Sequence, residues 1–443
     1  MPEEFLCVSV DLELRFPHCL HNRLTSALDN RRTDHELVQS VDESLFTTLC
    51  EDVFSLVNIQ VDLLHEYLQI NKIEKTEAGQ SLILVSLISI VRNLHELQLQ
   101  HRDRFLQNLE FSCAAANDFM RMIECFDDLM ESIHRRYPRL KLLINHPVQN
   151  EEDSAYMALL ESESSDLIAL YGNDAVYSVQ RSQMAAIDNI QQSSIPLDLF
   201  SVAWEDEFHN NEVARAIVSH AENFLRECHD QLSNAFLYGK IVSALIRAIV
   251  CFYVKCLLQK AKRVRLHKRG EADTGSLETP FVTPNRAVLR MLHDIEVFRK
   301  YFLHLIKPLP ELARLVEDEL SILVVFHECL TLASDDRDLS TPEDLIMVLH
   351  KRTGANPAVT RYIMKDLWLL AARDPDRQRA LYNTLTLLKG DLRVLSINLD
   401  ENVKDATSSR PRDHLPGLIL KEVLEQFYDH RIHKSTFHFM SLG

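Results

Sequence analysis

The chain has 443 residues, of which 46% are hydrophobic, and it carries a formal net charge of −17 at pH 7. The apolar share excludes disorder, and the length exceeds the roughly 250 to 300 residues at which one hydrophobic core stops growing, so at least two packed units are expected. The acidic balance excludes a dedicated nucleic-acid binder, because phosphate affinity needs a dominant basic face.

Glycine and cysteine usage narrow the fold class and the compartment. Nine glycines in the whole chain are far below the usual share of about 7%, which argues against hairpin-rich sheets, phosphate-binding loops and dinucleotide-binding folds. The nine cysteines are scattered and include no C-x-x-C pair, and the start MPEEFL leads into no signal-like apolar stretch. We therefore expect an all-α, cytosolic protein.

The first 50 residues differ from the rest. LCVSVDLELRF alternates Val8, Val10, Leu12 and Leu14, which is the period of a strand. Because no partner strand follows, we interpret 1–50 as an extended segment leading into the first helix, or as the remnant of a missing N-terminal region.

A first helical bundle is expected over 51–195. Apolar residues there recur at the helical period, and Pro138 closes the longest run. The stretch 150–166 holds six acidic and no basic residues, so we expect a solvated loop and a helix start there. The expected helices cover 51–68, 81–100, 108–137 and 166–192.

Further helical bundles are expected over 196–443. GEADTGSLETPFVTPNR, over 270–286, concentrates Gly, Pro, Thr and Ser and predicts an exposed loop. The helices are expected at 196–232, 240–269, 287–306, 309–334, 341–353, 357–373, 376–388 and 415–428.

One of these helices raises the question of a membrane anchor. The sequence KIVSALIRAIVCFYVKCLLQKAKRVRLHKRG runs from an apolar stretch into a basic tract. A spanning helix tolerates few central charges, yet Arg247 and Lys255 lie well inside this one, on a polar stripe. We predict a core helix buried on three sides, and no transmembrane segment.

The basic tract after that helix is the candidate contact site. Cations favour the C-terminal end of a helix, which is one explanation. Six cations in ten residues exceed that need, so contact with an anionic membrane or an acidic partner is the alternative. The residues are Lys260, Lys262, Arg263, Arg265, Lys268 and Arg269.

The search for catalytic or metal chemistry gives little. The His-Glu pairs at His65, His95 and His327 lack the second His of a zinc helix, so we expect surface or half-buried histidines. Neither the histidines near the C-terminus nor the aspartates at 335–338 complete a metal site. No nucleophile elbow or phosphate loop occurs, so we expect no enzyme activity, cofactor or metal.

Three stretches, in this order, resemble one family. They are EDVFSLVNIQVDLL at 51–64, NLEFSCAAANDFMRMIECFDDL at 108–129, with the polar pair Asn117 and Asp118, and YGKIVSALIRAIVCFYVKCLLQK at 238–260. Together they are similar to the Sec-six subunit of the exocyst, also called exocyst complex component three. Nothing before residue 51 matches the long N-terminal coiled-coil portion of that family.

The resemblance implies a rod of consecutive helical bundles that acts in docking secretory vesicles at the plasma membrane before fusion. It implies a cytoplasmic, peripheral location, with other exocyst subunits and SNARE proteins as partners. A generic helical adaptor or scaffold outside exocytosis is the alternative function.

Overall fold

The computed structural model describes residues 38–41, 44–47, 109–136, 151–206, 211–269, 279–307, 309–334, 342–387 and 420–431 without 430, together with single residues between 62 and 99. These residues form two compact units, which are described separately. Unit 1 comprises Met1–Ala185 and Leu225–Ile241, and unit 2 comprises Ala186–Phe224 and Val242–Gly443. The stretch LCVSVDLELRF lies outside the described residues.

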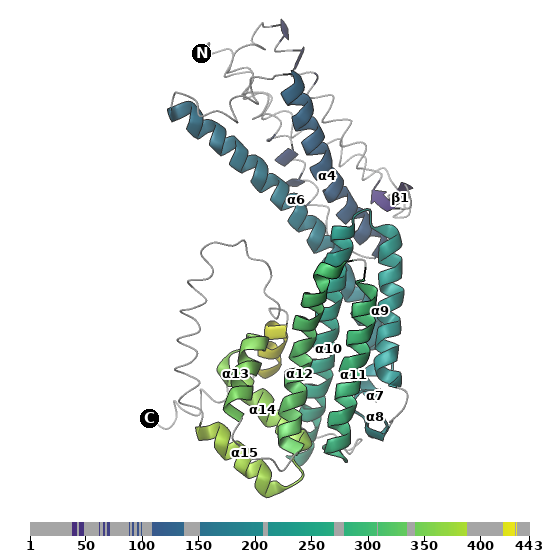
Figure 1. Ribbon diagram of the computed structural model, residues 1–443, viewed down its shortest axis with the longest axis vertical. Coiled ribbons are helices and arrows are strands. Elements are labelled where there is room, and N and C mark those ends of the chain that lie inside the picture. The colour runs from purple at the N-terminus through teal and green to yellow at the C-terminus, as the bar shows by residue number, and fades with distance from the viewer. Residues whose placement is uncertain are drawn as a thin grey trace. The chain divides into compact units, whose positions relative to one another are not determined.

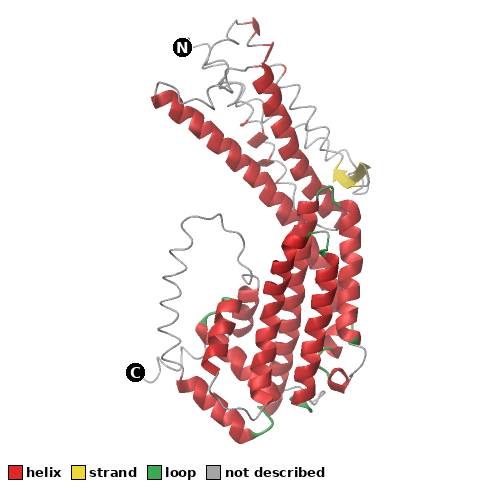
Figure 2. Ribbon diagram, in the orientation of Figure 1, coloured by secondary structure: helices red, strands yellow, loops and turns green. Residues whose placement is uncertain are grey.

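Helices dominate the described residues (Figures 1 and 2). The helices in chain order are α4 (Leu109–Arg136), α6 (Glu151–Gln192), α7 (Ile195–Asp198), α8 (Val202–Asp206), α9 (Glu212–Gln231), α10 (Ala235–Lys268), α11 (Pro284–Leu305), η2 (Pro310–Leu312), α12 (Ala313–Ser334), α13 (Pro342–Thr353), α14 (Pro357–Ala371) and α15 (Pro375–Leu387). A last helix covers 420–431. The all-α fold class is confirmed.

Unit 1 contains the one sheet of the described residues, an antiparallel hairpin of β1 (Val38–Val41) and β2 (Ser44–Thr47). It packs on α4, and Asn117 of that helix secures it. The fully buried Asn117 donates from Nδ2 to the carbonyl oxygens of Leu45, at 2.7 Å, and Gln231, at 2.8 Å. Its Oδ1 accepts from the backbone N–H and the hydroxyl of Ser233, both at 3.0 Å. One amide thus links β2, α4 and the end of α9.

A second polar contact in unit 1 lies against α6. Nε2 of His95 is 2.6 Å from a carboxylate oxygen of Asp174, and the His95 ring packs edge-on against Tyr171. Tyr171 donates its hydroxyl to the carbonyl oxygen of Val91 at 3.1 Å. His95 is only 4% exposed, so the expectation of a surface or half-buried histidine is wrong at this position.

Unit 2 is organised around α10 from Val242 onward, with a buried aromatic cluster beside it. Phe200 stacks edge-on against Trp204 and Tyr253, at centroid distances of 4.9 and 5.0 Å. Tyr253 in turn meets Phe298 of α11 at 5.8 Å. Phe281 also joins the cluster and is buried, so the loop predicted over 270–286 is packed where it leads into α11. Residues 270–278 lie outside the described part of the chain.

One carboxylate satisfies the polar groups of that aromatic cluster. Asp294 of α11 is fully buried and accepts hydrogen bonds from Trp204 Nε1, at 2.9 Å, and from the Tyr253 hydroxyl, at 3.0 Å. Arg290, one turn earlier on α11 and also buried, places Nε 3.6 Å from the second carboxylate oxygen. The charge of Asp294 is therefore balanced inside the core.

Two of the expected stretches differ most from the observed helices. The helix predicted over 196–232 is divided into α7, α8 and α9, with Phe200 (φ 66°) and Asn211 (φ 46°) in left-handed conformations between them. The acidic stretch at 150–166, expected to include a loop, is helical from Glu151 onward. Helical periodicity alone did not reveal either boundary.

Candidate interaction surface on α10

The apolar part of α10 is a core helix, as predicted. By length and composition α10 could cross a membrane, but 83% of its most apolar 18-residue window is buried inside the structure. Core helices of soluble proteins meet the same two criteria. Ile241, Leu245, Ile249, Phe252 and Leu257 are each 3% exposed or less.

The charge within this apolar run has a partner. Nε of Arg247 donates to a carboxylate oxygen of Glu319 on α12 at 2.5 Å, and the Glu319 side chain is 2% exposed. Burial raises the pKa of Glu319, whereas the Arg247 guanidinium lowers it. Arg247 therefore joins α10 to α12, which explains a cation in the middle of a core helix.

Lys260, the first of the six predicted contact residues, is buried. It is 4% exposed, and its ammonium group lies 5.2 Å from the centroid of the Phe281 ring. Glu205 of α8 accepts a hydrogen bond from the backbone N–H of Thr283 at 2.9 Å. Burial raises the pKa of the Glu205 carboxyl, and the nearby Lys260 ammonium offsets part of that rise. Lys260 is part of the core, so its predicted role in surface contact is corrected.

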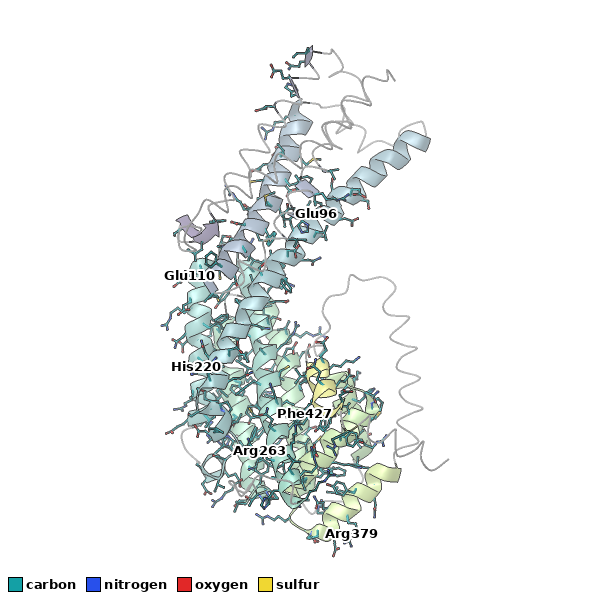
Figure 3. The ribbon with its side chains drawn as sticks, turned by 180° about the vertical axis from the view of Figure 1, so that it is seen from behind. Glu96, Glu110, His220, Arg263, Arg379 and Phe427 are labelled. Atoms are coloured by element: carbon teal, nitrogen blue, oxygen red, sulfur yellow. The ribbon has the colours of Figure 1, made fainter. Side chains whose placement is uncertain are left out.

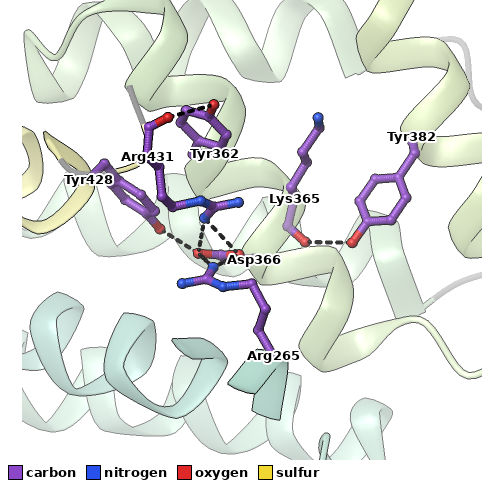
Figure 4. Close-up of polar contacts among 7 residues, drawn as sticks. All are labelled: Arg265, Tyr362, Lys365, Asp366, Tyr382, Tyr428 and Arg431. Carbon is purple, nitrogen blue, oxygen red and sulfur yellow. Dashed lines mark hydrogen bonds and ion pairs between the residues drawn. The ribbon is translucent and has the colours of Figure 1, made fainter. Parts of the chain in front are cut away.

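Arg265 also points into unit 2 (Figure 4). Its Nη1 contacts both carboxylate oxygens of Asp366 on α14, at 2.5 and 2.6 Å. Asp366 is 2% exposed, and it also accepts from the Tyr428 hydroxyl at 2.9 Å and from Nη1 of Arg431 at 3.0 Å. Arg265 thus holds helices together and is not available to a membrane.

The remaining four cations of the tract lie nearer the surface. Lys262 is half-buried, with its ammonium group 5.5 Å from the centroid of the Phe427 ring. Arg263 is also half-buried, and Figure 3 labels it and Phe427 on the same part of unit 2. Lys268 and Arg269, at the end of α10, are exposed. The tract therefore divides into an inward part and an exposed end.

The cluster around Asp366 was not predicted from the sequence. Its members come from α10, α14 and the helix at 420–431, three segments far apart in the chain. An aspartate within the apolar run of α14 was the available signal, because a buried carboxylate requires a partner. The sequence does not identify which of 48 Lys and Arg residues supplies it.

Metal chemistry finds no support among the described residues. No group of three or more His, Cys, Asp or Glu side chains in that part of the chain is placed to hold a metal ion. Burial lowers the pKa of His327. The C-terminal histidines His430, His433 and His438 and the aspartates at 335–338 lie outside the described residues.

The arrangement of helices is similar to that of one solved structure, a crystal structure of the C-terminal domain of the exocyst subunit Sec6p. The similarity covers 92% of this chain and 93% of that chain, with a TM-score of 0.59. The chain has the fold of that domain.

The sequence resemblance to this family is thus confirmed at the level of the fold. The identity to the Sec6p domain is 12%, so individual surface residues cannot be transferred from it. No family model and no curated protein matches the sequence.

Proposed function

We propose that the chain is a non-enzymatic subunit of the exocyst vesicle-tethering complex, acting in the docking of secretory vesicles at the plasma membrane before SNARE-mediated fusion. The observation that supports this function most is the similarity to the Sec6p domain along nearly the full length of both chains. The protein would act from the cytoplasm, at the periphery of the membrane where exocytosis occurs, with other exocyst subunits and SNARE proteins as partners.

The buried charged side chains of unit 2 contact other groups of the same unit, which is consistent with a protein that binds partners through its surface. Arg247, Arg265 and Lys260 engage groups inside unit 2, and the buried carboxylates Asp294 and Asp366 accept hydrogen bonds from core side chains. These groups fix the positions of helices relative to one another. Exposed helix faces would then be available for binding partners.

Affinity purification of the full chain from its native organism tests the proposal. We expect mass spectrometry of the purified material to recover other exocyst subunits. The control is the same tag on an unrelated acidic, all-α protein expressed at the same level. If the folded chain recovers no tethering subunit, the proposal is wrong and a helical adaptor outside exocytosis becomes the better interpretation.

Contact with an anionic membrane is a separate part of the proposal, now limited to the exposed end of the basic tract. Each Lys or Arg near an anionic leaflet contributes about 1 kcal/mol, so reversing Lys268 and Arg269 to Glu should weaken partitioning by roughly 30-fold or more. Flotation with phosphatidylserine vesicles at low and physiological salt measures this effect.

The matched control reverses two other exposed lysines of unit 2, Lys300 and Lys307, to Glu. This variant changes the net charge by the same amount, and we expect it to float like the parent. If the Lys268→Glu, Arg269→Glu variant also floats like the parent, or if no variant floats, the basic end of α10 is only a solvated helix terminus.

A further inference from the structure

The last helix that the structure describes, over 420–431, packs on the other helices of unit 2 by one narrow face. Leu420, Leu424 and Tyr428, spaced by four residues, are each 2% exposed or less. The side chain of Lys421 passes the turn between α13 and α14, where Gly354 has a φ of +61°. The helix therefore lies against α13 and α14 through an apolar stripe that ends in polar groups.

Those polar groups contact the Asp366 carboxylate (Figure 4). We call the surface that receives the helix, with Asp366, Tyr362 and Arg265, the seat. The helix contributes the Tyr428 hydroxyl, 2.9 Å from the carboxylate, and the Arg431 guanidinium, 3.0 Å from it. Arg431 also lies over the ring of Tyr362 on α14, with its Cζ 4.1 Å from the centroid, and the Tyr362 and Tyr428 rings stack at 5.9 Å. The seat thus recognises a tyrosine and an arginine three residues apart.

The seat would keep its charge balance if the helix left. Arg265 of α10 contacts both oxygens of Asp366 and belongs to the bundle, not to the seated helix. Departure of Tyr428 and Arg431 would therefore leave an ion pair and not an isolated buried carboxylate. Water could replace the lost contacts at the opened surface.

In the sequence, residues 388–419 separate the helix from α15. A buried ionic contact discriminates between partners because a partner without the matching charge leaves the other charge unpaired. The seat offers a paired carboxylate and an aromatic ring, and it covers apolar helix positions one and two turns before the Tyr. These are the features of a helix-binding site.

We propose that this seat is a binding site for a partner helix carrying Tyr and Arg three residues apart, with apolar residues four and eight positions before the Tyr. The chain's own C-terminal helix occupies the site in cis, and a partner helix of the same pattern takes its place. This proposal depends on contacts within unit 2 and is independent of the exocyst assignment.

A peptide-binding experiment on the full chain tests the proposal. The probe is a fluorescein-labelled synthetic peptide of residues 418–434, and the readout is fluorescence anisotropy. In the parent chain the tethered helix competes at an effective concentration in the millimolar range, so binding should be weak. The double variant Tyr428→Ala, Arg431→Ala should release that helix and bind the peptide at least tenfold more tightly.

Two controls test whether the recognition is that of the seat. A peptide with alanine at both the Tyr428 and the Arg431 position should bind the double variant at least tenfold more weakly than the parent peptide. Adding Asp366→Asn to the double variant should reduce binding of the parent peptide to a similar degree, because the acceptor charge is gone.

Two results would overturn the proposal. One is a double variant that keeps its helical content and unfolding midpoint but binds the peptide no better than the parent chain. The other is a double variant that loses its cooperative unfolding transition, which would make 420–431 an inseparable part of the core.

Discussion

Replacing Ile249 by Asp is expected to unfold unit 2. Ile249 is fully buried near the middle of α10, and Val250 and Leu245 beside it are 1% exposed or less. A carboxylate at this position would lose its hydration without gaining a partner, which costs several kcal/mol. Because whole proteins are stable by about 5 to 15 kcal/mol, this one change removes a large part of the total.

Circular dichroism during urea titration measures the effect, with Gln259→Asp as the matched control on the same helix. Gln259 lies on the less buried stripe of α10, so Asp there should change the free energy of unfolding by only about 0.5 kcal/mol. An Ile249→Asp chain with the parent's urea midpoint would show that α10 is not a core helix of a folded bundle.

The sequence was sufficient to place α10 in the core, and the reason is physical. Arg247 and Lys255 share one stripe, so the other faces of the helix could be assigned to the interior from the 3.6-residue period alone. The period reports which face is buried but not what covers it. For this reason the Arg247 contact with Glu319, 72 residues later in the chain, required the structure.

The sequence did not predict that 196–232 divides into α7, α8 and α9, and the reason is different. Bulky residues rarely adopt positive φ, and Phe200 does so because Trp204 and Tyr253 pack against its ring. That compensation comes from tertiary packing, which local propensity does not contain. Asn211 is a weaker case, because asparagine tolerates the left-handed conformation and could have marked the second break.

The hairpin and the Asp366 cluster show the same limit at the level of single groups. The polar pair at Asn117 and Asp118 was visible inside an apolar helix, but its role in holding Leu45 and Ser233 depends on segments 72 and 116 residues away. Composition suggested that the six cations of the basic tract share one role, contact with an anionic membrane or an acidic partner. Burial assigns Lys260 and Arg265 to the interior and leaves Lys268 and Arg269 exposed.

Asp294→Ala is expected to be the second most destabilising change, with a loss of about 3 to 5 kcal/mol. It removes the acceptor of both Trp204 Nε1 and the Tyr253 hydroxyl, and each donor is fully buried. It also leaves Arg290, which is 3% exposed, without the carboxylate that balances its charge. Urea unfolding of the variant measures the loss, and tryptophan emission reports on the environment of Trp204.

Two further variants separate the charge from the hydrogen bonds. Asp294→Asn keeps an acceptor oxygen but removes the negative charge, so it should be destabilising by less than Asp294→Ala. Combining Asp294→Ala with Arg290→Met also removes the buried guanidinium that faces the carboxylate, and this should restore part of the stability, since an apolar replacement of a buried ion pair is tolerated better than removal of one partner. If the double variant is no more stable than Asp294→Ala alone, the ion pair contributes little. The hydrogen bonds to Trp204 and Tyr253 would then account for the role of Asp294 in joining α8, α10 and α11.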